Sequence, residues 1–151
     1  MPGADSYAVE PQCKLPLSLG EEVVSTGRCC CGATSVEVSG EPTLVATCHC
    51  DDCRRRTGSA FGWSAYFPDE RVVGPDGTLS EYRPAVDDPQ MRWFCRNCGT
   101  TIAWRTGRFP GQVGVAAGAF VEDPLPSPSI VNRSSACVEW LTLPADWRHI
   151  A

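Results

Sequence analysis

The segment Phe94-Cys95-Arg96-Asn97-Cys98-Gly99 carries two cysteines separated by two residues and followed by a glycine. Two intervening residues let a loop curl around an ion, and backbone N–H groups can then hydrogen-bond the thiolates. Gly99 lacks a Cβ, so a positive φ at the loop exit costs little. A redox dithiol is the alternative, but it would need a helix starting inside the motif. The Gly-Thr-Thr-Ile that follows favours a strand, and the segment therefore predicts a metal-binding knuckle.

A partner for this knuckle lies in Gly27-Arg28-Cys29-Cys30-Cys31-Gly32. Cys29 and Cys31 can face the same side of a turn, and Gly32 allows the chain to reverse directly afterwards. Cys30 then points the other way and is interpreted as a buried or spare thiol. Two cysteines from each group complete a four-thiolate site, the closed tetrahedral arrangement of structural zinc. Such a site could contribute about 10 kcal/mol of apparent binding free energy to folding.

A third group, Thr47-Cys48-His49-Cys50-Asp51-Asp52-Cys53, holds three cysteines within six residues and has no fourth nearby. Three protein ligands and one open position are typical of catalytic zinc, because water or substrate must reach the metal. The alternative is a closed second structural site completed by His49 or by the remote Cys137. In an extended segment, His49 alternates away from its cysteine neighbours. The open site is the preferred interpretation, and the closed one stays possible at this point.

The residues after this group suggest where a substrate could bind. Three arginines follow Cys53, and they either offset the charge of the thiolates or bind an anionic substrate. A solvated charged surface is the plainer explanation of such a run. The substrate-binding candidates are Arg54, Arg55 and Ser59. No strong general base is evident, although Asp51, Asp52 and His49 can be considered.

Composition narrows the class of protein. The chain has 151 residues, of which 42% are hydrophobic and 21% charged, with a net charge of −5 and ten cysteines. The hydrophobic fraction is too high for a disordered chain, and the negative net charge argues against nucleic-acid binding. No apolar run approaches the roughly 20 residues of a membrane span, and no secretory signal is evident. We therefore expect a cytoplasmic protein whose cysteines bind metal rather than form disulfides.

Hydrophobic alternation predicts a mainly β domain with short helical turns. Residues 1–22 read as an extended N-terminal arm that carries the isolated Cys13, and residues 23–151 as a single zinc domain. Turns are expected at Gly40–Pro42, Gly74–Gly77 and Gly107–Gly111, and short helices at Asp51–Thr57 and Ala145–Ile150. The expected strands are Ala33–Ser39, Thr43–Thr47, Phe61–Phe67, Met91–Phe94, Thr101–Trp104 and Val113–Phe120.

Taken in order, these motifs resemble a known family. Gly-x-Cys-x-Cys-Gly, Cys-His-Cys-x-x-Cys-Arg, Gly-Ser and Phe-Cys-x-x-Cys-Gly-Thr are similar to the glutathione-dependent formaldehyde-activating enzymes, a family that includes centromere protein V. The resemblance covers about Ser25 to Trp140. It departs in the additional N-terminal arm and in the tail, Leu-Thr-Leu-Pro-Ala-Asp-Trp, where Asp-Gly-Leu-Pro would be expected.

The resemblance implies an Mss4-like, or β-tent, fold with two zinc ions. It implies a structural zinc on Cys29, Cys31, Cys95 and Cys98, and a second, substrate-facing zinc on Cys48, Cys50 and Cys53. The implied activity is that of a carbon–sulfur lyase that joins glutathione and formaldehyde, so a small thiol and a small aldehyde are the expected partners.

Two other functions are compatible with the same residues. A non-catalytic zinc module could bind a thiol or a protein partner, or buffer zinc, since tetrathiolate zinc commonly only holds a fold together. A thiol-redox protein would oxidise reversibly with loss of zinc. An open coordination position in the second cluster would distinguish the lyase from the module.

Overall fold

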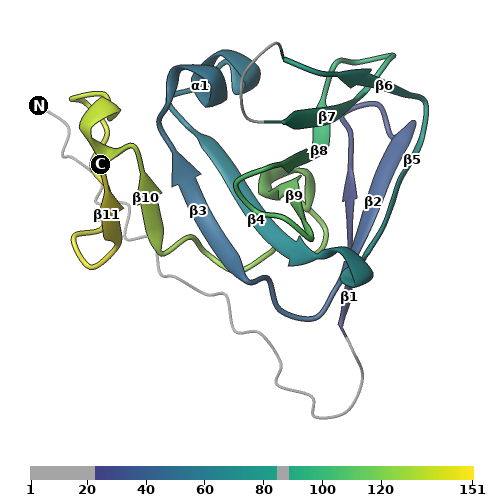
Figure 1. Ribbon diagram of the computed structural model, residues 1–151, viewed down its shortest axis with the longest axis horizontal. Coiled ribbons are helices and arrows are strands. Elements are labelled where there is room, and N and C mark those ends of the chain that lie inside the picture. Colours follow the sequence, from purple (N-terminus) through teal and green to yellow (C-terminus); the bar gives the residue numbers. More distant parts are fainter. Residues whose placement is uncertain (1–22, 85–88) are drawn as a thin grey trace, which may run out of the picture.

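The computed structural model describes residues 23–84 and 89–151, and Figure 1 shows the strands wrapping around a common interior. Within these residues the chain forms eleven strands and one α-helix. The strands are β1 (Val24–Arg28), β2 (Thr34–Ser39), β3 (Leu44–Cys48), β4 (Gly62–Pro68), β5 (Val72–Gly77), β6 (Leu79–Tyr82), β7 (Gln90–Cys95), β8 (Thr101–Thr106), β9 (Gln112–Ala116), β10 (Ile130–Asn132) and β11 (Arg148–Ile150). The helix is α1 (Asp51–Thr57), and 3-10 turns lie at Asp69–Arg71, Ala117–Ala119 and Ser134–Ala136.

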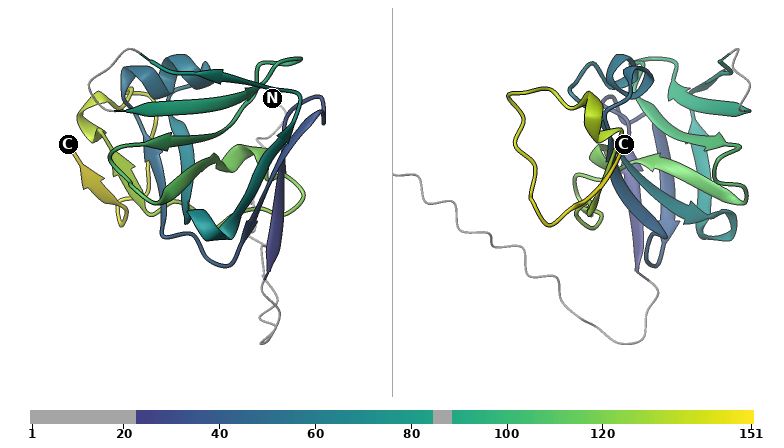
Figure 2. Two further views of the ribbon diagram at one scale, coloured as in Figure 1. Left: turned by 45° about the vertical axis from the view of Figure 1, so that its right-hand side comes forward. Right: turned by 60° about the vertical axis from the view of Figure 1, so that its left-hand side comes forward.

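The described strands form two sheets. One has three strands in the order β1-β2-β5, and the other has eight in the order β11-β10-β3-β4-β9-β8-β7-β6. Neighbouring strands are antiparallel except at β10, which pairs in parallel with both β3 and β11. Helix α1 follows β3 and lies at one end of the large sheet (Figures 1 and 2). The mainly β architecture with short helical turns confirms the predicted fold class and agrees with the Mss4-like arrangement.

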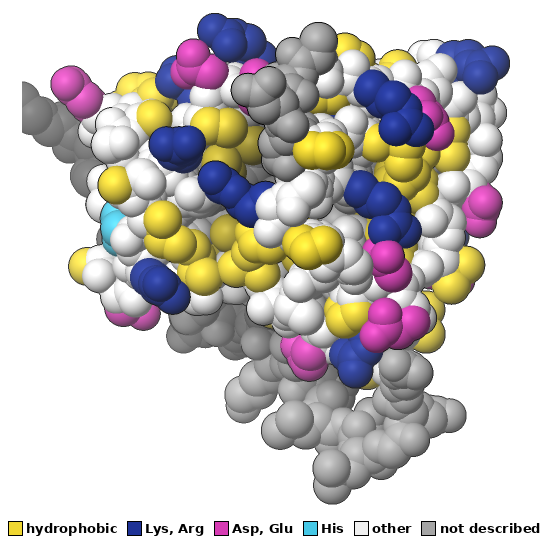
Figure 3. Space-filling view, in the orientation of Figure 1, with side chains coloured by type: hydrophobic (Ala, Val, Ile, Leu, Met, Phe, Trp, Pro, Cys, Tyr) yellow, Lys and Arg dark blue, Asp and Glu magenta, His cyan; other side chains and the backbone are white. Residues whose placement is uncertain are grey.

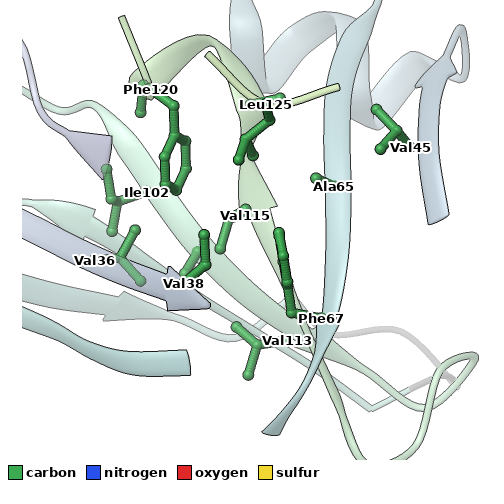
Figure 4. Packing of buried hydrophobic residues seen from close by; sticks show 13 residues of the cluster. Val36, Val38, Val45, Ala65, Phe67, Ile102, Val113, Val115, Phe120 and Leu125 are labelled. Atoms are coloured by element: carbon green, nitrogen blue, oxygen red, sulfur yellow. The ribbon is translucent and has the colours of Figure 1, made fainter. Parts of the chain in front are cut away.

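The hydrophobic core lies where the small sheet covers the large one. In β2, Thr34, Val36 and Val38 are buried while the residues between them face outward, as the period of two of a strand requires. Figure 4 shows Val36 and Val38 facing Ile102 and Val115 of the large sheet. The other members of this cluster include Val45, Ala65, Phe67, Ala103, Val113, Phe120 and Leu125.

Most of the predicted elements are present. The helix at Asp51–Thr57 is confirmed at both ends, and each of the first five predicted strands overlaps an observed strand. Two predictions were wrong. Gly74–Gly77 lies inside β5 rather than in a turn, because Asp76 and Gly77 pair with β2 beyond a shift in register. Ala145–Ile150 forms no helix, because Arg148–Ile150 pairs with β10 instead.

Two further outcomes concern the ends of predicted segments. The strand expected over Val113–Phe120 stops at Ala116, where the 3-10 turn Ala117–Ala119 begins. The N-terminal arm and Cys13 lie outside the described residues, so the predicted boundary at residue 22 stays a prediction.

Candidate metal centre

Two turns bring four cysteine sulfurs together, one between β1 and β2 and the other between β7 and β8. The Sγ atoms of Cys29, Cys31, Cys95 and Cys98 all lie within 4.8 Å of one another. Cys31 Sγ lies 3.6 Å from Cys29 Sγ and 3.6 Å from Cys95 Sγ. Zinc–sulfur bonds of 2.3 Å in a tetrahedron give sulfur–sulfur edges of about 3.8 Å. The thiols are free, and their spacing fits four ligands of one ion.

Each of these turns closes in the same way. Gly32 and Gly99 follow the second cysteine of their pair with φ of 75° and 76°, a conformation that favours glycine. The Gly32 N–H donates to the Cys29 carbonyl, and the Gly99 N–H donates to the Cys95 carbonyl. Glycine therefore ends each turn with a positive φ, as predicted. Both turns direct their cysteine sulfurs toward the same point.

Electrostatics favours a cation at this point. The Thr100 hydroxyl lowers the pKa of Cys98 to about 5, and the Thr34 hydroxyl lowers the pKa of Cys95. For Cys31, the Ala33 N–H lowers the pKa, but the neighbouring thiols and desolvation together raise it to about 12. Four crowded thiols therefore cannot all ionise without a positive charge among them. A metal ion could supply that charge, and the donor set fits zinc.

Cys30 is exposed and stands apart from the four sulfurs. Its sulfur accepts a hydrogen bond of 3.2 Å from the Thr100 hydroxyl, and its N–H donates to the same oxygen at 3.3 Å. It points away from the cluster as predicted, but it is not buried. Cys30 thus helps to hold the two turns together through a side chain of the neighbouring knuckle.

The second cluster forms where β3 runs into α1. Cys48 ends β3, Cys50 is the N-cap of α1, and Cys53 lies in its first turn. Their Sγ atoms lie within 4.8 Å of one another. The Cys50 sulfur accepts from the Cys53 N–H at 3.5 Å, and the Asn132 side-chain amide donates to Cys48 Sγ at 3.5 Å. Helix capping and sheet pairing together fix three donors that fit three ligands of one ion.

The thiols of this trio are not equivalent. A hydrogen bond from Cys53 lowers the pKa of Cys48, and the same contact raises the pKa of Cys53, where burial adds to the effect. A proton shared between two sulfurs indicates negative charge that a cation would stabilise. The cluster thus has the same preference for a metal ion as the four-cysteine site.

Neither proposed fourth ligand joins the trio. His49 is 0% exposed, its ring lies 5.4 Å from that of Phe61, and neither ring nitrogen has a hydrogen-bond partner among the described residues. Burial lowers the pKa of His49. Cys137 is half-buried and also stands outside the cluster. Over the described part of the chain, the trio has no fourth cysteine, histidine or carboxylate within ligand distance.

The trio opens into a cleft of about 760 Å³ on the face of the large sheet opposite the core. The floor follows from strand register, since Leu44 pairs with Tyr66 and Ala46 with Ser64. All four side chains line the cleft, while the alternating Val45 faces the core. The remaining lining residues include Cys48, Cys50, Asp52, Cys53, Arg56, Gln90, Arg92, Trp104, Thr106, Arg108, Phe109, Ile130, Asn132, Arg133 and Ile150.

The cleft is rich in positive charge. Its lining includes Arg56, Arg92, Arg108 and Arg133 against a single acidic side chain, Asp52. Within the described ranges, ion pairs are formed by Arg55, Arg83 and Arg105, none of which lines the cleft. Of the arginines in the cleft, Arg92 donates a hydrogen bond to the Gln90 side-chain oxygen at 3.1 Å. Basic side chains border a largely apolar area over β3 and β10, to the left of centre in Figure 3.

The predicted substrate residues lie elsewhere. Arg54, Arg55 and Ser59 line a smaller hollow of about 360 Å³ together with Asp51, outside the cleft. Arg55 pairs with Asp51 at 3.3 Å, and the Ser59 hydroxyl lies 3.1 Å from that of Thr57. Of the three consecutive arginines, Arg56 is the one that enters the cleft.

The residues that form the floor of the cleft were not predicted from the sequence. Tyr66 and Trp104 received no role beyond that of core or strand residues, although both line the cleft. The available signal was alternation, because Leu44, Ala46 and Cys48 share one face of β3 and their partners in β4 must face the same way. That signal becomes useful only once the pairing of β3 with β4 is known.

No helix in the described ranges is long and apolar enough to span a bilayer. The expected cytoplasmic location stays a prediction.

The fold and its two thiol clusters define a small, mainly β protein with sites that could hold metal ions. The chain belongs to the glutathione-dependent formaldehyde-activating enzyme family, whose model matches residues 24–133. A Schizosaccharomyces pombe protein named as an uncharacterized lyase is 30% identical over 86 residues, which are 56% of this chain. The match spans 61% of that relative's length.

A solved structure has a similar fold. The crystal structure of a Rhodobacter sphaeroides protein superimposes with a TM-score of 0.51 and 26% sequence identity. The match covers 64% of this chain and 87% of the other. The family match over residues 24–133 confirms the predicted family resemblance.

Proposed function

We propose that this protein is a zinc-dependent carbon–sulfur lyase that adds an anionic thiol such as glutathione to formaldehyde, and cleaves the S-hydroxymethyl adduct in reverse. Family membership and the lyase-named relative support an activity of this type. The observation that carries the finer proposal is that Cys48, Cys50 and Cys53 converge without a fourth ligand and open into the arginine-lined cleft. The tetrathiolate cluster would hold a second, structural zinc.

The three cysteines of the trio would hold the reactive zinc, and no other described ligand competes for its remaining position. When bound, this zinc would supply a Lewis acid that lowers the pKa of an incoming thiol. The role of the protein is to position the thiol beside the aldehyde and to keep the site dry. Trp104 and Phe109 contribute aromatic surface to the wall of the cleft.

The arginines of the cleft support the proposed preference for an anionic thiol. Glutathione carries a carboxylate at each end, and guanidinium groups bind carboxylates with paired hydrogen bonds. Arg56 lies next to the trio on α1, whereas Arg92 and Arg108 come from β7 and from the segment after β8. A thiol held at the trio can therefore meet positive charge in more than one direction.

The reaction needs no oxidant or reductant. In the forward direction a bond forms between sulfur and the carbonyl carbon, and the π electron pair of the carbonyl moves onto oxygen. The proton lost by the thiol ends on that oxygen. Thiols add to formaldehyde readily, so the protein needs to lower the barrier by only about 3 kcal/mol to accelerate the reaction a hundredfold.

The test measures bound metal and adduct exchange together. We expect two zinc ions per chain in the wild type and accelerated exchange between glutathione, formaldehyde and the adduct by NMR. Cys50→Ala should lose one zinc and the acceleration, and Cys48→Ala should do the same without removing the helix cap. Cys137→Ala is the matched control and should keep both. Retention of two zinc ions and full activity in both trio variants would contradict the proposal.

A further inference from the structure

Tyr66 lines the cleft, and its hydroxyl has one hydrogen-bonding direction that no described group uses. Trp104 Nε1 donates to this oxygen at 3.1 Å, and no other described group is hydrogen-bonded to it. A phenol has one O–H to donate as well as lone pairs to accept. Indole N–H is a donor only, so the Tyr66 proton is not used by Trp104. That proton is available to a ligand in the cleft.

The surrounding side chains fix the position of this hydroxyl. The Tyr66 ring meets Trp104 edge-on, with centroids 6.2 Å apart and planes at 82°, and lies 4.5 Å from Phe109. Gly114 pairs with both Tyr66 and Trp104 in the sheet. A Cβ at Gly114 would overlap Trp104 and come within 2.9 Å of Tyr66 Cε1. The absent side chain therefore makes room for the aromatic pair.

Burial keeps the same hydroxyl in its neutral form. Desolvation is the main cause of the raised pKa of Tyr66, and the hydrogen bond from Trp104 acts in the opposite direction. The phenol thus stays protonated at neutral pH, where its ordinary pKa of about 10 already favours the acid. Because Trp104 donates to the oxygen, the O–H is polarised and becomes a better donor.

We propose that Tyr66 is a catalytic residue of the lyase reaction, whose hydroxyl donates a hydrogen bond to the aldehyde oxygen as a thiol adds to the carbonyl carbon. The assignment rests on the function proposed above. As the carbon–sulfur bond forms, the carbonyl π pair moves onto oxygen and negative charge develops there. A preorganised donor stabilises that charge more than it stabilises the neutral aldehyde. The oxygen finally keeps the proton that the thiol gave up, and Tyr66 ends the cycle as it began, as a neutral phenol.

Tyr66→Phe tests the proposal, since it removes the hydroxyl and keeps the ring. We expect kcat for adduct formation to fall about ten- to a hundredfold, with zinc content and the dissociation constant of glutathione unchanged. Tyr82→Phe is the matched control, because its side chain lies on the exposed strand β6, and it should keep wild-type kcat. A Tyr66→Phe variant with kcat within twofold of wild type would overturn the proposal, as would a loss of kcat that follows loss of zinc.

A binding measurement separates this proposal from the function itself. S-(2-hydroxyethyl)glutathione carries a terminal hydroxyl that imitates the adduct, and S-propylglutathione carries a methyl group instead. The wild type should bind the first about fivefold more tightly, and Tyr66→Phe should lose this preference. If the wild type does not accelerate adduct exchange at all, the lyase function and the catalytic role of Tyr66 both fail. If exchange is accelerated but the preference is the same in both proteins, the assignment of Tyr66 alone is wrong.

Discussion

The guanidinium of Arg56 lies over the indole ring of Trp104, with its Cζ 4.4 Å from the ring centroid. This contact joins α1 to β8 across the cleft. It depends on Gly62, since a Cβ there would come within 2.8 Å of Arg56 Nη2 and 3.2 Å of Cys53 Cβ. Stacking on an aromatic face holds the guanidinium in place while leaving its N–H groups free to bind an anion. Arg56 is thus positioned beside the cysteine trio before any ligand arrives.

The first prediction concerns this arginine. Arg56→Gln should raise KM for glutathione about tenfold, the equivalent of roughly 1.4 kcal/mol, because a charge-assisted hydrogen bond to a carboxylate is lost. KM for an uncharged thiol such as 2-mercaptoethanol should change less than twofold. Steady-state kinetics with both thiols measures the difference.

Arg55→Gln provides the comparison for this test. Arg55 is exposed and pairs with Asp51 outside the cleft, so its removal should leave both KM values within twofold of wild type. A rise in KM for glutathione in Arg55→Gln as large as in Arg56→Gln would favour the substrate site predicted from the sequence.

A second prediction concerns the glycine beneath the aromatic pair. Gly114→Ala should lower the free energy of unfolding by about 1–3 kcal/mol, because the new methyl group overlaps Trp104 in a packed sheet. Denaturant titration measures the change. Gly118→Ala is the control, since nothing lies within 4 Å of a Cβ there, and it should be nearly neutral. Equal stabilities of the two variants would show that the sheet relaxes around position 114.

The sequence predicted what depends on local spacing. Paired cysteines with a following glycine predicted both metal-binding turns, and the helix α1 was expected over the residues where it forms, Asp51–Thr57. The cleft depends on long-range pairing instead. Tyr66 and Trp104 meet only because β4 and β8 both pair with β9, and no local pattern specifies that order. The strand at Arg148–Ile150 was missed for the same reason.

The third prediction concerns the four-cysteine cluster, and the adjacent Cys30 serves as its control. Cys95→Ser should lose one zinc and lower the melting temperature by at least about 10 °C, because a metal ion held by all four cysteines would tie β1–β2 to β7–β8 and its binding would contribute to folding. Cys30→Ser should keep both zinc ions and melt within about 2 °C of wild type, since a hydroxyl can still accept from Thr100. Calorimetry with metal analysis distinguishes the two. A Cys95→Ser variant that melts like wild type would show that this cluster is not needed for the fold.

The fourth prediction concerns pH and the buried His49. Burial lowers its pKa in the folded protein below the 6.5 of an exposed histidine, so the unfolded chain takes up a proton that the folded one does not. The free energy of unfolding should therefore be at its full value above about pH 6.5 and should fall as the pH drops below it, by at most about 1.4 kcal/mol per pH unit. His49→Gln should give a flatter profile than wild type between pH 6.5 and about 5.5, whatever its absolute stability, and the exposed His149→Gln should keep the wild-type slope.

Thiolates also release zinc as they are protonated, which destabilises the protein in the same direction. Metal content must therefore be measured at each pH, and the difference between the His49→Gln and wild-type slopes is the quantity that reports His49. Parallel profiles at equal zinc content would mean that His49 is protonated as readily inside the fold as outside it.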